Sequence, residues 1–219
     1  MKIPVKESAA GSIILIDKPL RWTSFDIIKK IKKSLDIAKA GHAGTLDPLA
    51  TGLLIVCTGD KTKEIGQFQS MTKEYTGTFT LGEIRPSVDH ETPVIETRDI
   101  SGITLETLIH TASLFTGKID QVPPIYSAIK KAGKRAYNLA RKGKTVVLAP
   151  RKVTAFEFEI TAFHPPEVYF RLVTSKGFYV RSLARDFGEK LGCGACLSSL
   201  RRTKIGKFSV RDATKMDTF

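Results

Sequence analysis

The sequence predicts an α+β fold, with a mixed, mainly antiparallel sheet flanked by helices, built as a single domain over residues 1–219. Segments with strand periodicity do not alternate regularly with segments of helical periodicity, which argues against a doubly wound parallel sheet. Two strand patterns, residues 153–163 and 168–174, are separated only by a short turn at Pro165-Pro166, and so short a link favours antiparallel pairing. With 219 residues, of which 42% are hydrophobic, the chain can bury a core of its own without disulfides.

Local patterns place the other elements in order along the chain. Residues 12–16 form an apolar run that is expected to be a buried strand, and it ends at Asp17-Lys18-Pro19. Thr23 or Ser24 can cap the helix that follows. Its apolar face is expected to carry four side chains: Phe25, Ile28, Ile31 and Leu35. Further strands are expected at residues 53–57 and 74–81, and further helices at residues 61–69, 105–115, 134–141 and 179–191.

The charge of the chain favours a polyanionic partner. Lys and Arg number 35 against 22 acidic residues, which gives a net charge of +13 and a pI near 9.7. The charge is also segregated: residues 118–152 and 171–211 hold ten basic residues each, with one and two acids respectively. Only 8% of the residues are aromatic, which is few for stacking the bases of single strands. Structured RNA or a duplex backbone is therefore the expected partner.

The composition also indicates the compartment. Three cysteines without framework spacing indicate a reducing environment. Residues 1–11 lack the apolar core of a signal peptide, and no apolar run approaches the roughly 18 residues that span a bilayer. We therefore expect a cytoplasmic protein with no membrane partner.

Motifs for metals and nucleotide cofactors are incomplete. Cys193 and Cys196 form a C-x-x-C pair, but a structural zinc site needs two more ligands at matching spacing. Gly143-Lys144-Thr145 resembles the end of a P-loop, yet Asn138 stands where the first glycine would be. No G-x-G-x-x-G follows a strand, and the four histidines show no ligand spacing: His42, His90, His110 and His164. The sequence therefore predicts no metal and no cofactor.

One glycine-rich segment stands out as a candidate reactive loop. Residues 41–52 read GHAGTLDPLATG, with three glycines, one proline and a single carboxylate, Asp47. This composition predicts a shaped loop, and the apolar strand at residues 53–57 would anchor it. On local physics alone, Asp47 could equally be an ordinary turn residue before a proline.

Residues 41–52 resemble the G-H-x-G-T-L-D-P-x-A-T-G signature of the TruB family of tRNA pseudouridine-55 synthases. The resemblance continues in order along nearly the whole chain, so the sequence is identified as a member of that family. The other matching blocks are Leu15-Ile16-Asp17-Lys18-Pro19 with Trp22-Thr23-Ser24-Phe25-Asp26, Lys73-Glu74-Tyr75-Thr76-Gly77 with Leu81-Gly82, the segment QVPPIYSAIK at residues 121–130, the segment SKGFYVRSLA at residues 175–184, and Leu200-Arg201-Arg202-Thr203.

The resemblance implies a function and a set of site residues. It implies a pseudouridine synthase catalytic domain that flips a uridine out of the T-arm loop of tRNA, at position 55, and isomerises it to pseudouridine without a cofactor. It assigns catalysis to Asp47, Tyr75 and Arg181, with Arg181 holding the Asp47 carboxylate. It assigns substrate binding to four residues: His42, Lys18, Leu200 and Lys130. The tRNA T-arm stem-loop is the expected partner, and no obligate protein partner is evident.

Two departures from the family pattern and three alternatives stay open. Arg85 stands where the family often has Thr, and the chain stops at Phe219, whereas many members continue into a C-terminal RNA-binding appendage. The alternatives are a pseudouridine synthase for another RNA, a chaperone that folds tRNA by opening its arm, and a basic DNA-binding module. The last lacks a helix-turn-helix or finger pattern.

Overall fold

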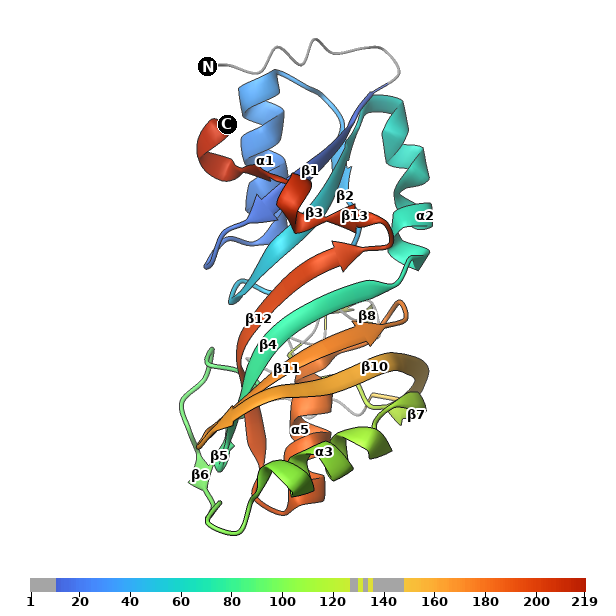
Figure 1. Cartoon of the computed structure of the whole chain (residues 1–219). Coiled ribbons are helices and arrows are strands. Elements are labelled where there is room, and N and C mark those ends of the chain that lie inside the picture. The colour runs from blue at the N-terminus through green and yellow to red at the C-terminus, as the bar shows by residue number, and fades with distance from the viewer. Residues whose placement is uncertain (1–10, 127–129, 132–133, 136–147) are drawn as a thin grey trace. The chain divides into compact units, whose positions relative to one another are not determined.

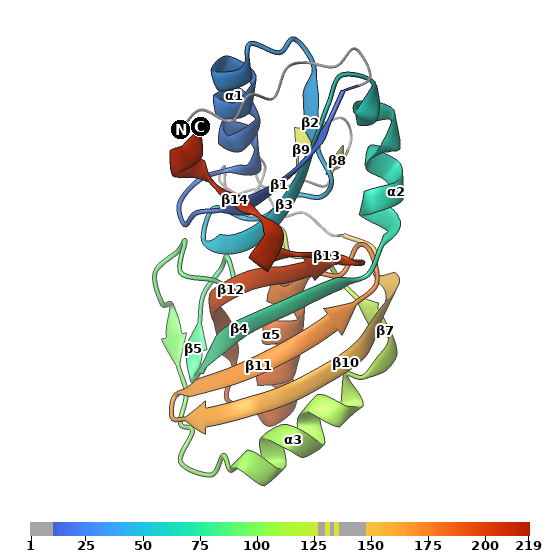
Figure 2. The same cartoon turned by 45° about the horizontal axis from the view of Figure 1, so that its top comes forward.

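The computed structural model describes residues 11–126, 130–131, 134–135 and 148–219, and it divides into two compact units. The first unit is made of the described residues up to Thr76 together with Ser199–Phe219, and the second of those in Gly77–Ser198. Figure 1 and Figure 2 show helices packed on strands in both units. Strand pairing is mixed and mainly antiparallel, so the predicted fold class is confirmed.

Strand β3 (Ala50–Thr58) is the centre of the first unit. It pairs antiparallel with β1 (Ile13–Lys18) and β2 (Ala40–His42), and parallel with β12 (Ala195–Ile205). The predicted strand at residues 12–16 is confirmed and extends through Lys18. Completing the unit are β4 (Lys73–Leu81), beside β12, and three short elements: β13 (Phe208–Ser209), β14 (Thr214–Lys215) and the 3-10 turn Met216–Thr218. Both β4 and β12 contribute residues to both units.

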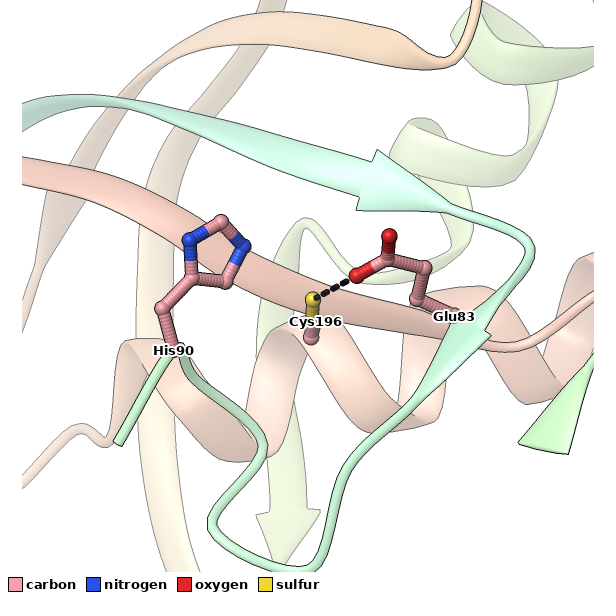
Figure 3. Close-up of side chains that lie close together, drawn as sticks. All are labelled: Glu83, His90 and Cys196. Carbon is pink, nitrogen blue, oxygen red and sulfur yellow. Dashed lines mark hydrogen bonds between the residues drawn. The ribbon is translucent and has the colours of Figure 1, made fainter. Parts of the chain in front are cut away.

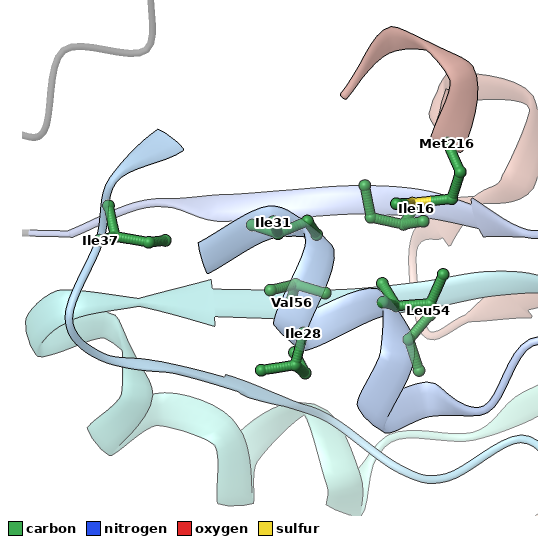
Figure 4. Packing of buried hydrophobic residues seen from close by; sticks show 8 residues of the cluster. Ile16, Ile28, Ile31, Ile37, Leu54, Val56 and Met216 are labelled. Atoms are coloured by element: carbon green, nitrogen blue, oxygen red, sulfur yellow. The ribbon is translucent and has the colours of Figure 1, made fainter. Parts of the chain in front are cut away.

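Helix α1 (Ser24–Leu35) covers one face of these strands. It begins as predicted at Thr23, whose side chain accepts a hydrogen bond from the Asp26 amide in a capping box. Figure 4 shows the apolar cluster beneath it. The predicted apolar face is wrong at Phe25, which is 62% exposed, because the buried stripe runs through Ile27 instead. The cluster consists of Ile16, Ile27, Ile28, Ile31, Ile37, Leu54, Val56 and Met216.

Helix α2 (Ile65–Ser70) contributes to a second apolar cluster of the first unit. Its Phe68 packs with Leu53 and Ile55, which alternate along β3 with the residues under α1. The helix predicted over residues 61–69 is only partly confirmed, because the chain first forms a 3-10 helix over Gly59–Glu64.

The second unit is built on the antiparallel pair β10 (Arg151–His164) and β11 (Glu167–Thr174), which confirms the predicted hairpin. Strand β7 (Gly117–Gln121) pairs antiparallel with β10, and β4 lies beside β11. Helix α5 (Val180–Leu191) packs on this sheet, and α3 (Leu105–Leu114) contacts both α5 and β10. Both helices confirm predicted elements. The ring of Phe187 on α5 lies 5.6 Å from that of Phe158 and 5.7 Å from that of Phe79.

Two short strand pairs complete the described residues of this unit. Strand β5 (Glu83–Ile84) pairs with β6 (Glu96–Thr97), and β8 (Lys130–Lys131) pairs with β9 (Lys134–Arg135). The predicted helix over residues 134–141 is therefore wrong at its first two residues, and the rest of it lies outside the described residues. Within the described part of the chain, no helix is long and apolar enough to cross a membrane.

Candidate active site

The loop that carries Asp47 joins β2 to β3, and its backbone is held at every residue from Gly44 to Pro48. All five consecutive carbonyl oxygens accept a hydrogen bond. The donors are Arg202 for Gly44 and Thr45, Ser24 for Leu46, the Ala50 amide for Asp47, and Lys18 with the Arg21 amide for Pro48. A loop held at each peptide has little freedom to move the carboxylate that it carries.

Arg202 on β12 holds the first half of the loop. It is 2% exposed. Its Nη2 donates to the Gly44 carbonyl at 3.1 Å, its Nη1 to the Thr45 carbonyl at 3.5 Å, and its Nε to the Leu53 carbonyl at 2.8 Å. Burial lowers the pKa of Arg202, and its charge interaction and hydrogen bond with Tyr75 oppose that shift. The guanidinium therefore links the loop to Tyr75 on β4.

Lys18, at the end of β1, holds the second half. Its side chain is fully buried, and its Nζ donates to the carbonyls of Trp22 at 2.6 Å, Pro19 at 3.0 Å and Pro48 at 3.4 Å. Burial lowers the pKa of Lys18 to about 8, and the negative charge of Asp47 partly offsets this. Lys18 is therefore an electrostatic neighbour of Asp47 whose donors are aimed at backbone.

Ser24, the first residue of α1, fixes the residue before Asp47. Its hydroxyl accepts from the Leu46 amide at 3.0 Å and donates to the Leu46 carbonyl at 3.2 Å. Only 2% of Ser24 is exposed, so water competes little for these bonds. The N-terminus of α1 thus packs directly against the reactive loop.

The strand register sets these groups in one row. Lys18 on β1 is opposite Gly52 on β3, and Gly52 is opposite Arg202 on β12. At Gly52, where φ is +100°, a Cβ would lie 2.3 Å from the Arg202 carbonyl oxygen. The glycine that closes the 41–52 segment therefore permits β12 to approach β3 closely enough to deliver Arg202.

The other predicted residues of the first unit surround the same loop. Asp47 is partly exposed, and Tyr75 is 8% exposed. Leu200 pairs with Ala50, three residues after Asp47. Burial lowers the pKa of His42, and the charge of Arg202 lowers it further, so this imidazole is neutral at neutral pH. Its Nδ1 is buried with no hydrogen-bond partner in the part of the chain that the structure describes.

Arg181 belongs to the second unit, at the start of α5. It is 5% exposed, and its Nε lies 3.6 Å from Oδ2 of Asp89. Its Nη1 donates to the Ser87 carbonyl at 3.2 Å and its Nη2 to the Tyr126 carbonyl at 2.8 Å. The positive end of the helix dipole disfavours a cation at the N-terminus of α5. The Asp89 carboxylate and the two backbone carbonyls offset this cost for Arg181. The predicted contact of Arg181 with Asp47 stays a prediction.

Asp89 was not predicted as a site residue. Its Oδ1 accepts from the Glu91 amide at 2.9 Å, and only 4% of the residue is exposed. Arg85, which departs from the family pattern, binds Glu83 and the Thr92 carbonyl and so braces the same segment. The side chain of Lys130 lies outside the described residues.

Arg202 was predicted only as part of a matching block and Ser24 only as a possible helix cap, so their contacts with the loop were missed. No feature of a single sequence distinguishes a buried arginine that holds backbone carbonyls from a surface arginine. The density of small and polar residues in residues 41–52 was the available signal, because such a loop needs partners for its backbone groups.

Comparisons with known proteins show which family the chain resembles. A family model described as the TruB family pseudouridylate synthase N-terminal domain matches residues 32–180. A second, described as the tRNA pseudouridylate synthase B C-terminal domain, matches residues 181–219. A protein of Flavobacterium johnsoniae named tRNA pseudouridine synthase B is 50% identical to this chain, over 98% of this chain and 96% of the relative. A protein of the same name from Chloroherpeton thalassium is 49% identical, over 93% of this chain and 86% of the relative.

Solved structures of related proteins share the fold. A chain in the crystal structure of a Cbf5-Nop10-Gar1 complex has a TM-score of 0.75 and 27% identity, over 99% of this chain and 59% of that one. A chain of an H/ACA RNP bound to a substrate RNA containing 2'-deoxyuridine has a TM-score of 0.71 and 26% identity, over 95% and 52%. This chain therefore spans little more than half of those longer proteins. On the family models and the identities to full-length relatives, the chain belongs to the TruB family of pseudouridylate synthases.

Proposed function

We propose that this protein isomerises a uridine in the T-arm loop of transfer RNA, at position 55, to pseudouridine. The observation that carries the proposal is the loop of Asp47, in which five consecutive carbonyls are hydrogen-bonded while Asp47 itself is partly exposed. A group held in this way loses little freedom when substrate binds, which is the arrangement expected for chemistry. The names of the full-length relatives supply the substrate class.

The reaction breaks the bond between the ribose and N1 of uracil, turns the base, and rejoins it through C5. Asp47 is the carboxylate on which this exchange depends. Reactant and product contain the same atoms, so no cofactor, metal or nucleotide triphosphate is required. The detached uracil must be retained and water must be excluded, which calls for a closed pocket around the flipped base.

The neighbouring residues take roles that match their surroundings. The ring of Tyr75 stacks on the target uracil, and its hydroxyl is oriented by the guanidinium of Arg202. Neutral His42 fills the space that the flipped base leaves in the RNA stack, since an uncharged imidazole is easily desolvated. Lys18 acts mainly on the position of Asp47 through the Pro48 carbonyl, and Leu200 lines the pocket beside the loop.

The basic partner of Asp47 is Arg181, whose planar guanidinium can hold a carboxylate through two hydrogen bonds. Lys130 is assigned to substrate binding, as the family resemblance implies. Because transfer RNA is made and used in the cytoplasm, we expect the protein to act there, without an obligate protein partner.

Site-resolved mapping of pseudouridine in transfer RNA tests the proposal. We expect the purified protein to modify position 55, and Asp47→Asn to remove turnover while RNA affinity stays within a few-fold. Asp60→Asn is the matched control, because Asp60 lies in the same unit, paired with Lys63 on the surface. Appreciable pseudouridine formation by Asp47→Asn would contradict the catalytic role of Asp47. Modification of ribosomal RNA alone would show that the substrate is a different RNA.

The T-arm assignment has its own test. A structured loop can be recognised by shape and flipped bases, so an isolated T-arm stem-loop should be a nearly complete substrate. Its kcat/KM should lie within about tenfold of full-length transfer RNA, a gap of about 1.4 kcal/mol. A loss of about 100-fold or more would show essential contacts outside that arm.

A further inference from the structure

A cluster of three ligand-bearing side chains lies in the second unit. Glu83 comes from β5, His90 from the turn that follows it, and Cys196 from β12. Figure 3 shows the carboxylate, the imidazole and the thiol facing a common point. One ligand atom from each lies within 4.8 Å of the other two, and Sγ of Cys196 lies 3.8 Å from Oε2 of Glu83. Sequence spacing did not group these residues, because 113 positions separate Glu83 from Cys196.

We propose that Glu83, His90 and Cys196 form a site for a divalent transition-metal ion of the zinc class. One sulfur, one imidazole nitrogen and one carboxylate oxygen are a ligand set that suits Zn²⁺, whereas Mg²⁺ and Ca²⁺ prefer oxygen ligands alone. Three protein ligands leave the fourth tetrahedral position to a water molecule.

The geometry needs only a small adjustment to bind the ion. Zinc bonds of about 2.0–2.3 Å place neighbouring tetrahedral ligands roughly 3.5 Å apart, so the widest pair must close by about 1 Å. His90 is exposed and its imidazole makes no hydrogen bond to other described residues, so it can rotate inward. Arg85 binds Oε2 of Glu83, the oxygen nearest to Cys196, through Nε at 3.0 Å and Nη2 at 2.8 Å, so the ion would share that oxygen or bind Oε1.

Two anionic ligands and the neighbouring Arg85 set the charge of the site when the ion is bound. On binding, the S–H proton is released to solvent as the metal–sulfur bond forms. One thiolate and the Glu83 carboxylate then match the two charges of the cation, while the Arg85 guanidinium, which interacts with both side chains, adds one positive charge beside them.

The backbone around the cluster is already ordered. The Ser87 hydroxyl donates to the Asp89 carbonyl at 3.0 Å and the Leu197 amide to the Val88 carbonyl at 2.9 Å. His90 therefore follows a fixed turn, and Cys196 immediately precedes the residue that binds that turn. An ion would cross-link β12 to the turn that carries Asp89, which pairs with Arg181.

Titration with Co²⁺ in place of Zn²⁺ tests the site, because a thiolate ligand gives a charge-transfer absorption in the near ultraviolet. The full chain should take up one ion with this absorption, and Zn²⁺ should displace it. His90→Ala alters an exposed residue and so leaves the fold intact. This variant should weaken Co²⁺ binding by at least about 100-fold. Loss of a residue that only orients a metal ligand costs about 10- to 100-fold in affinity, and loss of a direct ligand should cost at least as much. Cys196→Ser should remove the absorption.

Matched controls separate this site from adventitious binding. Cys193→Ser alters the other cysteine of the C-x-x-C pair and His110→Ala another histidine of the same unit, and both should bind Co²⁺ as the wild type does. Hydrogen exchange of the amides at residues 88–92 should slow with Zn²⁺ in the wild type and not in His90→Ala. The proposal is overturned if no thiolate absorption forms, if His90→Ala retains it, or if Cys193→Ser loses it.

Discussion

The guanidinium of Arg202 hydrogen-bonds the carbonyl of Gly44, 158 residues earlier in the chain, at 3.1 Å. Through this contact a strand near the C-terminus holds the loop of Asp47, and the same guanidinium interacts with the Tyr75 side chain. A single buried cation thus sets the positions of two proposed catalytic groups. Its contribution can be separated from that of the groups that touch substrate.

Arg202→Lys should reduce both stability and turnover. Lysine keeps the charge but cannot reach three carbonyls with a planar fork, so buried acceptors lose their partners. We expect the free energy of unfolding to fall by about 1–3 kcal/mol, measured by urea denaturation. We also expect kcat to fall by at least about tenfold, while the Kd for RNA changes less.

Arg201→Lys is the matched control. Arg201 is the neighbouring residue, but its side chain is 41% exposed and paired with Asp17. A surface ion pair contributes about 0–1 kcal/mol, so both readouts should stay near wild type. Equal effects of the two variants, or normal turnover by Arg202→Lys, would contradict the positioning role.

The lowered pKa of Lys18 predicts that the free energy of unfolding rises at alkaline pH. Burial lowers its pKa from 10.5 to about 8, so between about pH 8 and 10.5 the unfolded chain binds more protons than the folded one. Its contribution to the free energy of unfolding therefore increases as pH rises through that window. The Lys18→Met variant has no titrating group at this position, so it lacks this pH-dependent contribution. The free energy of the wild type minus that of Lys18→Met should grow between neutral pH and about pH 10.

Denaturant titrations at several pH values measure this difference. Lys29→Met, which alters an exposed lysine on α1, should show no such trend. A wild-type minus Lys18→Met difference that is flat across the window would mean that Lys18 keeps its ordinary pKa when folded.

Arg181→Lys should act on kcat more than on KM. A lysine keeps the charge beside Asp89 but loses the fork that reaches the Ser87 and Tyr126 carbonyls, and with it the proposed hold on Asp47. Steady-state kinetics with transfer RNA separate the effect on kcat from the effect on KM. Arg185→Lys, one turn along α5, is the control. An effect confined to KM would instead place Arg181 on a phosphate group.

RNA binding should depend steeply on salt. The basic segments at residues 118–152 and 171–211 hold ten cations each. Each phosphate contact adds about 0.7–0.9 to the slope of log K against log salt, so we expect a magnitude of at least about 3. Fluorescence anisotropy with a labelled T-arm stem-loop measures the slope. A flat response would assign the charge to another purpose.

The predictable parts of the fold were those in which periodicity records burial. Helix α5 and the β10–β11 hairpin present apolar residues at regular intervals, and both were confirmed. Strand β12 was missed because its sequence contains Ser198, Ser199, Arg201 and Arg202 in a row of largely polar residues. Hydrogen bonds to distant carbonyls stabilise the buried Arg202 there, and no local pattern encodes them. Phe25 was misplaced because nothing local distinguishes an apolar residue at the edge of the stripe from one at its centre.

The candidate site divides in the same way. The glycines and proline of residues 41–52 predicted a shaped loop around Asp47, and the loop is present. The partners that hold it come from α1, β1 and β12, and only the folded chain brings them together. The cluster of Glu83, His90 and Cys196 likewise depends on strand pairing, so spacing along the sequence could not reveal it.

The division of the first unit between residues up to Thr76 and Ser199–Phe219 has a consequence for biosynthesis. Ribosomes extend chains at about 5–20 residues per second, so Arg202 is added roughly 8–30 s after Gly44. During that interval the nascent chain carries Asp47 in a loop without Arg202, and every residue of the second unit is synthesised before Arg202 is added. The enzyme should therefore remain inactive on the ribosome until Arg202 has been added, and messages truncated before codon 202 should yield no functional product.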